Sequence, residues 1–199
     1  PIVGGPDAGA GAHGAHEVVI FDPDHSCDLA RMTDAGVEEL FVVLRDRARV
    51  HAGAGLAHVQ VLVNHGRAAG ASIAHPHAQV IAIELVPPLV RDAMARAAAA
   101  RADVVAVDWE ASGPQGGRVV DAPGVWAWCP WAAASPYETR IAAPDAGPRF
   151  EDTPDAALAA VARVTRDVVA GIGRLLGEVA YNVILHTSPA PPHAPAPDD

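Results

Sequence analysis

The sequence predicts an α+β fold in which helices pack against antiparallel sheets, and two observations lead to this class. First, several short segments alternate apolar and polar side chains, as strands with one buried face do, while two longer segments repeat apolar residues at helical spacing. Second, the glycine-rich turn that joins the two central strands is too short for a parallel crossover. These strands are therefore expected to run antiparallel.

The first half of the chain is expected to contain three strands and two helices. In order, these are a strand over 16–21, a helix over 33–50, strands over 59–64 and 79–85, and a helix over 87–101. Thr33 can cap the first helix, because a threonine hydroxyl accepts a hydrogen bond from a free N–H of the first turn. Gly53 and Gly55 are expected to end this helix.

The second half is expected to repeat this plan. Strands are predicted over 117–121, 125–129 and 137–142, followed by a long helix between Pro154 and Gly177 and a strand over 179–186. The recurrence of strand, helix and strand predicts a degenerate internal duplication. We expect a first module over 1–92, and a connector with a second module over 93–199.

Composition and charge exclude several classes of protein. The net charge is -10 and all 14 basic residues are arginine, with no basic stripe, so nucleic acid is not an expected partner. Arginine still suits phosphate, because its planar fork binds two oxygens at once. Cys27 and Cys129 are too few for a disulfide framework, and neither a signal peptide nor a membrane-spanning run is found. A cytoplasmic protein with no membrane partner is expected.

The two ends of the sequence suggest a fragment. The chain starts at Pro1 without a methionine, and it stops after a proline-rich run without a closing element. We therefore expect a chain truncated at both ends, whose second module is incomplete.

The segment over 64–79 carries the strongest chemical signal. It reads Asn-His-Gly-Arg-Ala-Ala-Gly-Ala-Ser-Ile-Ala-His-Pro-His-Ala-Gln and leads into a strand. Its small residues let the backbone approach a bulky ligand, and two imidazoles and a carboxamide stand at the mouth of the strand. A lone His-x-His is more often a surface or metal pair than a nucleophile. The spaced asparagine, serine and glutamine favour a nucleotide phosphate site with a histidine nucleophile.

His77 is the expected nucleophile. For its Nε2 atom to attack phosphorus, its Nδ1 atom should carry a proton and donate it, and a backbone carbonyl near His75 is the expected acceptor. Pro76 holds His75 extended. Gln79, Ser72 and Asn64 can donate to a phosphoryl oxygen; each such donor contributes about 2–4 kcal/mol in a transition state.

The pattern over 64–79 resembles the active-site signature of galactose-1-phosphate uridylyltransferases, a branch of the histidine-triad superfamily. The segments over 21–26, 130–139 and 181–189 resemble other parts of that family. The resemblance implies two tandem histidine-triad-like modules, each an antiparallel sheet with a packed helix. It also implies a homodimer in which two subunits build each active site.

The activity implied by this resemblance is ping-pong nucleotidyl transfer in galactose metabolism. His77 would take UMP from UDP-glucose, and galactose 1-phosphate would then collect it. The residues expected to bind substrate are Asn64, Gly70, Ser72, His75 and Gln79.

The resemblance also implies a structural zinc ion. The family's two histidine ligands correspond to His25 and His75, but the Cys-x-x-Cys pair that completes the site is absent from this sequence. We expect the other ligands upstream of the chain, and we interpret Cys27 as a small buried side chain. His186 corresponds to a ligand of a second metal site whose other ligands are missing, so no second metal is expected.

Two alternatives stay open. The first is another enzyme of the superfamily, a phosphorylase or transferase that moves an adenylyl group from diadenosine polyphosphate or adenylyl sulfate. The second is a non-catalytic nucleotide-binding relic, although a relic has no reason to keep Asn64, Ser72, His77 and Gln79 together. Preference for a uridine over an adenine nucleotide would separate the first alternative, and absence of a covalent adduct would support the second.

Overall fold

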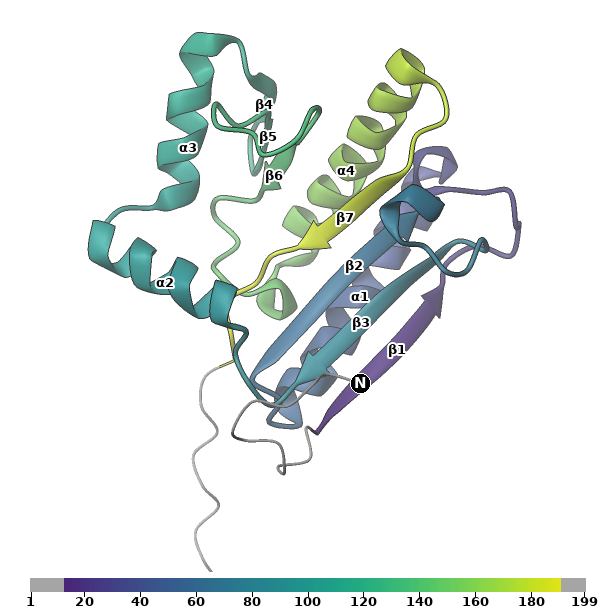
Figure 1. The fold of residues 1–199 in the computed structure, drawn as a ribbon, viewed down its shortest axis with the longest axis horizontal. Coiled ribbons are helices and arrows are strands. Elements are labelled where there is room, and N and C mark those ends of the chain that lie inside the picture. The colour runs from purple at the N-terminus through teal and green to yellow at the C-terminus, as the bar shows by residue number, and fades with distance from the viewer. Residues whose placement is uncertain (1–12, 191–199) are drawn as a thin grey trace, which may run out of the picture.

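The segment with the nucleophile motif lies in a four-stranded antiparallel sheet. In the computed structural model, which describes residues 13–190, the strands follow the order β1 (Gly14–Ile20), β3 (His77–Ile83), β2 (His58–His65) and β7 (Tyr181–Leu185) (Figure 1). The predicted α+β class and the antiparallel run of the two central strands are confirmed.

One face of this sheet packs on helix α1 (Asp34–Gly53), which lies behind the sheet in Figure 1. Ala78, Val80 and Ala82 of β3 are fully buried on that face. Side chains alternate along a strand, so His77 and Gln79 lie on the opposite face. That face also holds Val18, Ile20 and Ile184, each about half exposed at 48, 53 and 50 %, and no helix of residues 13–190 covers it.

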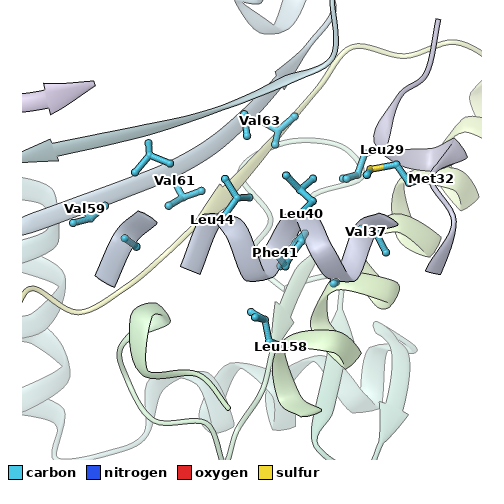
Figure 2. Close-up of a cluster of buried hydrophobic side chains, with 14 of the residues drawn as sticks. Leu29, Met32, Val37, Leu40, Phe41, Leu44, Val59, Val61, Val63 and Leu158 are labelled. Atoms are coloured by element: carbon cyan, nitrogen blue, oxygen red, sulfur yellow. The ribbon is translucent and has the colours of Figure 1, made fainter. Parts of the chain in front are cut away.

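Helix α1 forms where the sequence predicts it. The Thr33 hydroxyl accepts a hydrogen bond from the Gly36 N–H at 3.1 Å, which confirms the expected cap. Figure 2 shows Leu40 and Leu44 of this helix facing the valines of β2. The core residues of the two elements are Val37, Leu40, Phe41, Leu44, Ala48, Val59, Val61 and Val63. This contact fixes the sheet on its helix.

Helix α4 (Asp155–Leu176) packs on α1 on the side away from the sheet, where Leu158 enters the core (Figure 2). Three arginine–carboxylate pairs join the two helices: Arg166 with Asp34, Arg163 with Glu38, and Arg45 with Asp155. The helix ends at Gly177, as predicted, with a positive φ of 82°.

Two helices and a second sheet lie between β3 and α4 in the sequence. They are α2 (Pro88–Ala100), α3 (Val104–Ser112) and a second sheet of β4 (Arg118–Ala122), β5 (Val125–Trp128) and β6 (Arg140–Ala142); the 3-10 turns are η1 (Leu29–Arg31), η2 (Arg67–Ala69), η3 (Gly113–Gln115) and η4 (Phe150–Asp152). Trp109 stacks on Trp126 and meets the edge of Trp128, which forms a small core here. Trp131 lies outside this core and is 70 % exposed.

The last strand returns to the first sheet. β7 pairs with β2, with Asn182 opposite Asn64, so residues from beyond position 93 complete the sheet that carries His77. The division into modules over 1–92 and 93–199 stays a prediction.

Within the described residues, no helix combines the length and apolar character needed to cross a bilayer.

The packing of α4 on α1 predicts unequal effects for two leucines of the same helix. Leu158 is 1 % exposed and Leu175 is 76 % exposed. We expect Leu158→Ala to lower the free energy of unfolding by about 2–5 kcal/mol, because it removes buried methyl groups and leaves a cavity. Leu175→Ala, the matched control, should change it by less than about 0.5 kcal/mol. Urea titrations would measure both, and equal losses would show that α4 is not docked through Leu158.

Candidate functional site

The ring of His77 is held by a backbone carbonyl. His77 is the first residue of β3 and is 4 % exposed, and its Nδ1 atom lies 2.8 Å from the carbonyl oxygen of His75. A carbonyl oxygen only accepts hydrogen bonds, so Nδ1 carries the proton and donates it. The predicted hydrogen bond to a carbonyl near His75 is confirmed. In the neutral ring the lone pair is therefore on Nε2, the atom that a nucleophile would use.

The side chain of His75 points away from that of His77. Its Nε2 atom donates to the backbone carbonyl of Asp22 at 2.9 Å, which leaves a lone pair on Nδ1. This Nδ1 atom lies 3.0 Å from Nδ1 of His25, and the two ring centroids are 5.2 Å apart. The structure thus brings together the two histidines predicted to bind metal.

The geometry of this pair fits half of a zinc site. Two nitrogen ligands of a tetrahedral zinc ion lie roughly 3.3 Å apart, because each Zn–N bond is about 2.0–2.1 Å long. Residues 13–190 contain no group of three or more histidine, cysteine or acidic side chains that could hold a metal. Cys27 is half-buried, and burial together with the neighbouring Asp22 raises the pKa of its thiol to about 11. Cys27 was expected to be a small buried side chain, and the structure places it only partly buried.

Gln79 follows His77 by two residues and lies on the same open face. Its Oε1 atom is 3.0 Å from Nε2 of His16, which comes from the neighbouring strand β1. Sequence reasoning did not single out His16. The signal that could have found it was the alternation along 14–20, which puts His16 on the same face as Val18 and Ile20.

The other predicted substrate-binding residues lie at the same end of the sheet. Leu62 pairs with Gln79, and this antiparallel register, continued by two residues, brings Asn64 opposite His77. Gly70 ends the η2 turn with a φ of 85°, a conformation that favours glycine. Ser72 is exposed in the loop between β2 and β3.

A cavity of about 230 Å³ lies elsewhere, at the C-terminal end of α1. Arg49, Arg149, Glu151 and Asp152 line it, and none of the residues over 64–79 does. Its arginines are already paired: Arg49 with Asp46, and Arg149 with Glu151 and Asp152. The open face around His77 therefore remains the candidate site.

Comparison with known proteins shows what the first part of the chain resembles. Residues 9–87 match the family model of the galactose-1-phosphate uridyl transferase N-terminal domain. Over these residues the chain is similar to galactose-1-phosphate uridylyltransferases. The match spans the strands and helix that form the site, including every predicted site residue.

Individual known proteins are similar to the chain over different lengths. The chain is 27 % identical to ADP-glucose phosphorylase of Arabidopsis thaliana over 185 residues, which cover 88 % of this chain and 50 % of that protein. It is 38 % identical to galactose-1-phosphate uridylyltransferase of Haemophilus influenzae over 76 residues, or 38 % of this chain and 22 % of that protein. The crystal structure of a GalT-like protein from A. thaliana superposes with a TM-score of 0.77 at 25 % identity, over 89 % of this chain and 60 % of that one. The chain thus spans half or less of the curated relatives it matches.

A second buried histidine lies at the other end of β2 from the site. His58 is 3 % exposed, and its Nδ1 atom has no hydrogen-bond partner among the described residues. Burial lowers the pKa of His58 and outweighs the opposing effects of the Gln60 side chain and the Glu151 carboxylate, while His186 lowers it further. The folded protein therefore holds His58 neutral.

This burial predicts a stability that depends on pH. Between the ordinary histidine pKa of about 6.5 and the lowered value, the unfolded chain binds more protons than the folded one, so stability falls as the pH drops through this window. We expect His58→Gln to reduce the difference in free energy of unfolding between pH 7.5 and pH 5.5. The exposed His13, changed to Gln, is the matched control and should leave that difference unchanged. An unaltered pH dependence in His58→Gln would contradict the prediction.

Proposed function

We propose that this chain carries the nucleophile of a nucleotidyltransferase, which moves a nucleoside monophosphate from a nucleoside diphosphate hexose through a covalent bond to His77. One observation carries the proposal: Nδ1 of His77 donates to the carbonyl of His75 at 2.8 Å, which leaves a lone pair on Nε2. A histidine held in one tautomer is what covalent catalysis at phosphorus requires, because only an unprotonated nitrogen can attack.

The proposed reaction has two balanced steps. In the first, Nε2 of His77 forms a bond to the α-phosphorus, and the bond from that phosphorus to the bridging oxygen breaks. The hexose 1-phosphate leaves with the electron pair. In the second, a phosphate oxygen of the acceptor attacks the same phosphorus and returns the electron pair to Nε2. Covalent catalysis thus replaces one difficult transfer between phosphates with two easier ones.

The neighbouring side chains have proposed roles in charge stabilisation. Gln79 would donate from its amide nitrogen to a phosphoryl oxygen, and Asn64 and Ser72 would donate similarly. Gly70, with its positive φ, would let the loop backbone come close to the phosphates. Each donor acts on negative charge that develops in the transition state, where a fixed donor is most effective.

The first candidate substrates are UDP-glucose as donor and galactose 1-phosphate as acceptor. The enzyme that uses them would be a homodimer. The resemblance of residues 64–79 to the uridylyltransferase signature supports this first pair, as does the Haemophilus influenzae relative. ADP-glucose as donor and inorganic phosphate as acceptor form the second pair. The longer match to an ADP-glucose phosphorylase, over 185 residues, supports this second pair.

Zinc is a separate part of the proposal. His25 and His75 would supply two of four ligands through their Nδ1 atoms, and the others would come from outside the residues described here. Such an ion would be structural, tying the turn after β1 to the loop before β3. The 3.0 Å separation of the two nitrogens and the hydrogen bond from His75 to Asp22 support this arrangement.

The covalent intermediate is testable by intact mass. After incubation with UDP-glucose or ADP-glucose in separate samples, we expect the wild-type protein to gain an acid-labile nucleotidyl group. His77→Ala should gain none, because the attacking nitrogen is gone. A uridylyl increment would assign the first donor, and an adenylyl increment the second.

The matched control for this experiment is His13→Ala, which removes an exposed imidazole outside the site. It should label as the wild type does. A folded wild-type sample that gains no increment from either nucleotide would refute covalent transfer and leave a nucleotide-binding module.

The zinc proposal has its own measurement. We expect zinc to bind the wild-type chain, and His25→Ala to weaken that binding by about 10- to 100-fold, because one of the two paired nitrogens is lost. Isothermal titration calorimetry of the metal-free protein would measure both affinities. The exposed His186, changed to Ala, is the control. Equal affinities for His25→Ala and the wild type would exclude this pair as the zinc site.

A further inference from the structure

We infer that His16 is a positioning residue that fixes the amide of Gln79 for nucleotidyl transfer. The inference rests on the proposed function, because Gln79 acts there on the transferred phosphoryl group. It is carried by the 3.0 Å contact between Nε2 of His16 and Oε1 of Gln79. The two residues are 63 positions apart in the sequence and meet only because β1 and β3 are neighbours in the sheet.

The register of the two strands places His16 within reach of Gln79. Gln79 lies opposite Val18, and His16 lies opposite Ile81, so His16 and Gln79 are diagonal neighbours. Diagonal side chains on one face of an antiparallel pair can touch when both are long. The same register puts Ile20 opposite His77. Along β3, Gln79 thus lies between His77 and the position opposite His16. The imidazole of His16 therefore contacts Gln79 from the side that faces away from His77.

The contact selects one orientation of the glutamine amide. The amide oxygen only accepts hydrogen bonds and the amide nitrogen only donates them. An Nε2–H group of His16 binds the oxygen, so the amide nitrogen of Gln79 is turned away from His16 and left to donate elsewhere. If the amide rotated by half a turn, its oxygen would face the phosphoryl group instead of its nitrogen. The amide oxygen and the phosphoryl oxygen both carry negative charge and would then repel each other.

His16 thus adds no new contact to the substrate and acts through Gln79. Without it, the amide of Gln79, on a side chain that is only partly buried, would populate both orientations. A donor that must be reoriented during the reaction stabilises a transition state less than one already in place. The loss should therefore appear in the rate of the chemical step and not in the affinity for the nucleotide.

Variants at position 16 separate positioning from packing. In a glutamine side chain the amide nitrogen lies roughly where Nε2 of histidine does, and in an asparagine it lies roughly where Nδ1 does. We expect His16→Gln to keep the rate of nucleotidyl-His77 formation, and both His16→Asn and His16→Ala to lower it by about tenfold. The donor concentration that gives half of the maximal rate should stay within about twofold. His13→Ala, from just before the same strand, is the matched control.

A double-mutant cycle tests whether His16 acts through Gln79. We expect Gln79→Ala to be slower than His16→Ala, and His16→Ala/Gln79→Ala to be no slower than Gln79→Ala alone. Losses that multiply in the double variant would overturn the inference, because His16 would then act independently. A His16→Ala protein that labels as fast as the wild type would overturn it too, while the proposed function would stand.

The orientation of the amide can be tested without catalysis. In the ¹⁵N-labelled chain, we expect NMR to show Nε2 of His16 protonated, and His16→Ala to shift the side-chain amide signals of Gln79 more than His13→Ala does. A His16 ring protonated only on Nδ1 would overturn the inference. A wild-type protein that forms no adduct would end the proposed function and this role together.

Discussion

The hydrogen bond from Nδ1 of His77 to the carbonyl of His75 is the constraint on which the site depends. Pro76, which lies between the donor and the acceptor residue, favours an extended conformation of His75. The carbonyl of Pro76 in turn accepts from the N–H of Phe21, at the end of β1. The ring of His77 is thereby tied to the backbone of two strands.

The two faces of the sheet differ in role: one packs in the core and the other carries the polar side chains of the candidate site. The face toward α1 is dry, and on β3 it is built from alanine and valine, which leave no polar group without a partner. No α-helix of residues 13–190 covers the other face, where His16 is exposed and Gln79 and Asn64 are partly exposed, while His77 is 4 % exposed. A one-residue shift in register would exchange the two faces, and the core contact with α1 resists this shift.

Much of the fold follows from the sequence, because local patterns decide it. The alternation along 59–64 and the helical spacing from Val37 to Ala48 match β2 and α1 closely. Helix α3 was not predicted, since a run of valines over 104–107 has no helical periodicity and only the cap at Asp103 marks its start.

The site was predictable where its parts are close in sequence and not where they meet across strands. The bond between His77 and His75 could be derived from the chemistry of an attacking nitrogen. The approach of His25 to His75 was expected only from the family resemblance. The contact of His16 with Gln79 depends on strand order, since β1 pairs with β3 and not with β2, and no local pattern specifies that order.

His75 connects two parts of the site through different atoms. Its carbonyl oxygen orients His77, while its ring contacts His25 and the carbonyl of Asp22. The ring is held at both nitrogens, so the backbone of His75 has little freedom to turn, and the carbonyl keeps its direction. A metal bound between the two rings would replace one hydrogen bond by two stronger bonds without moving that carbonyl. Under the zinc proposal, metal binding would therefore make the orientation of the His77 ring more rigid.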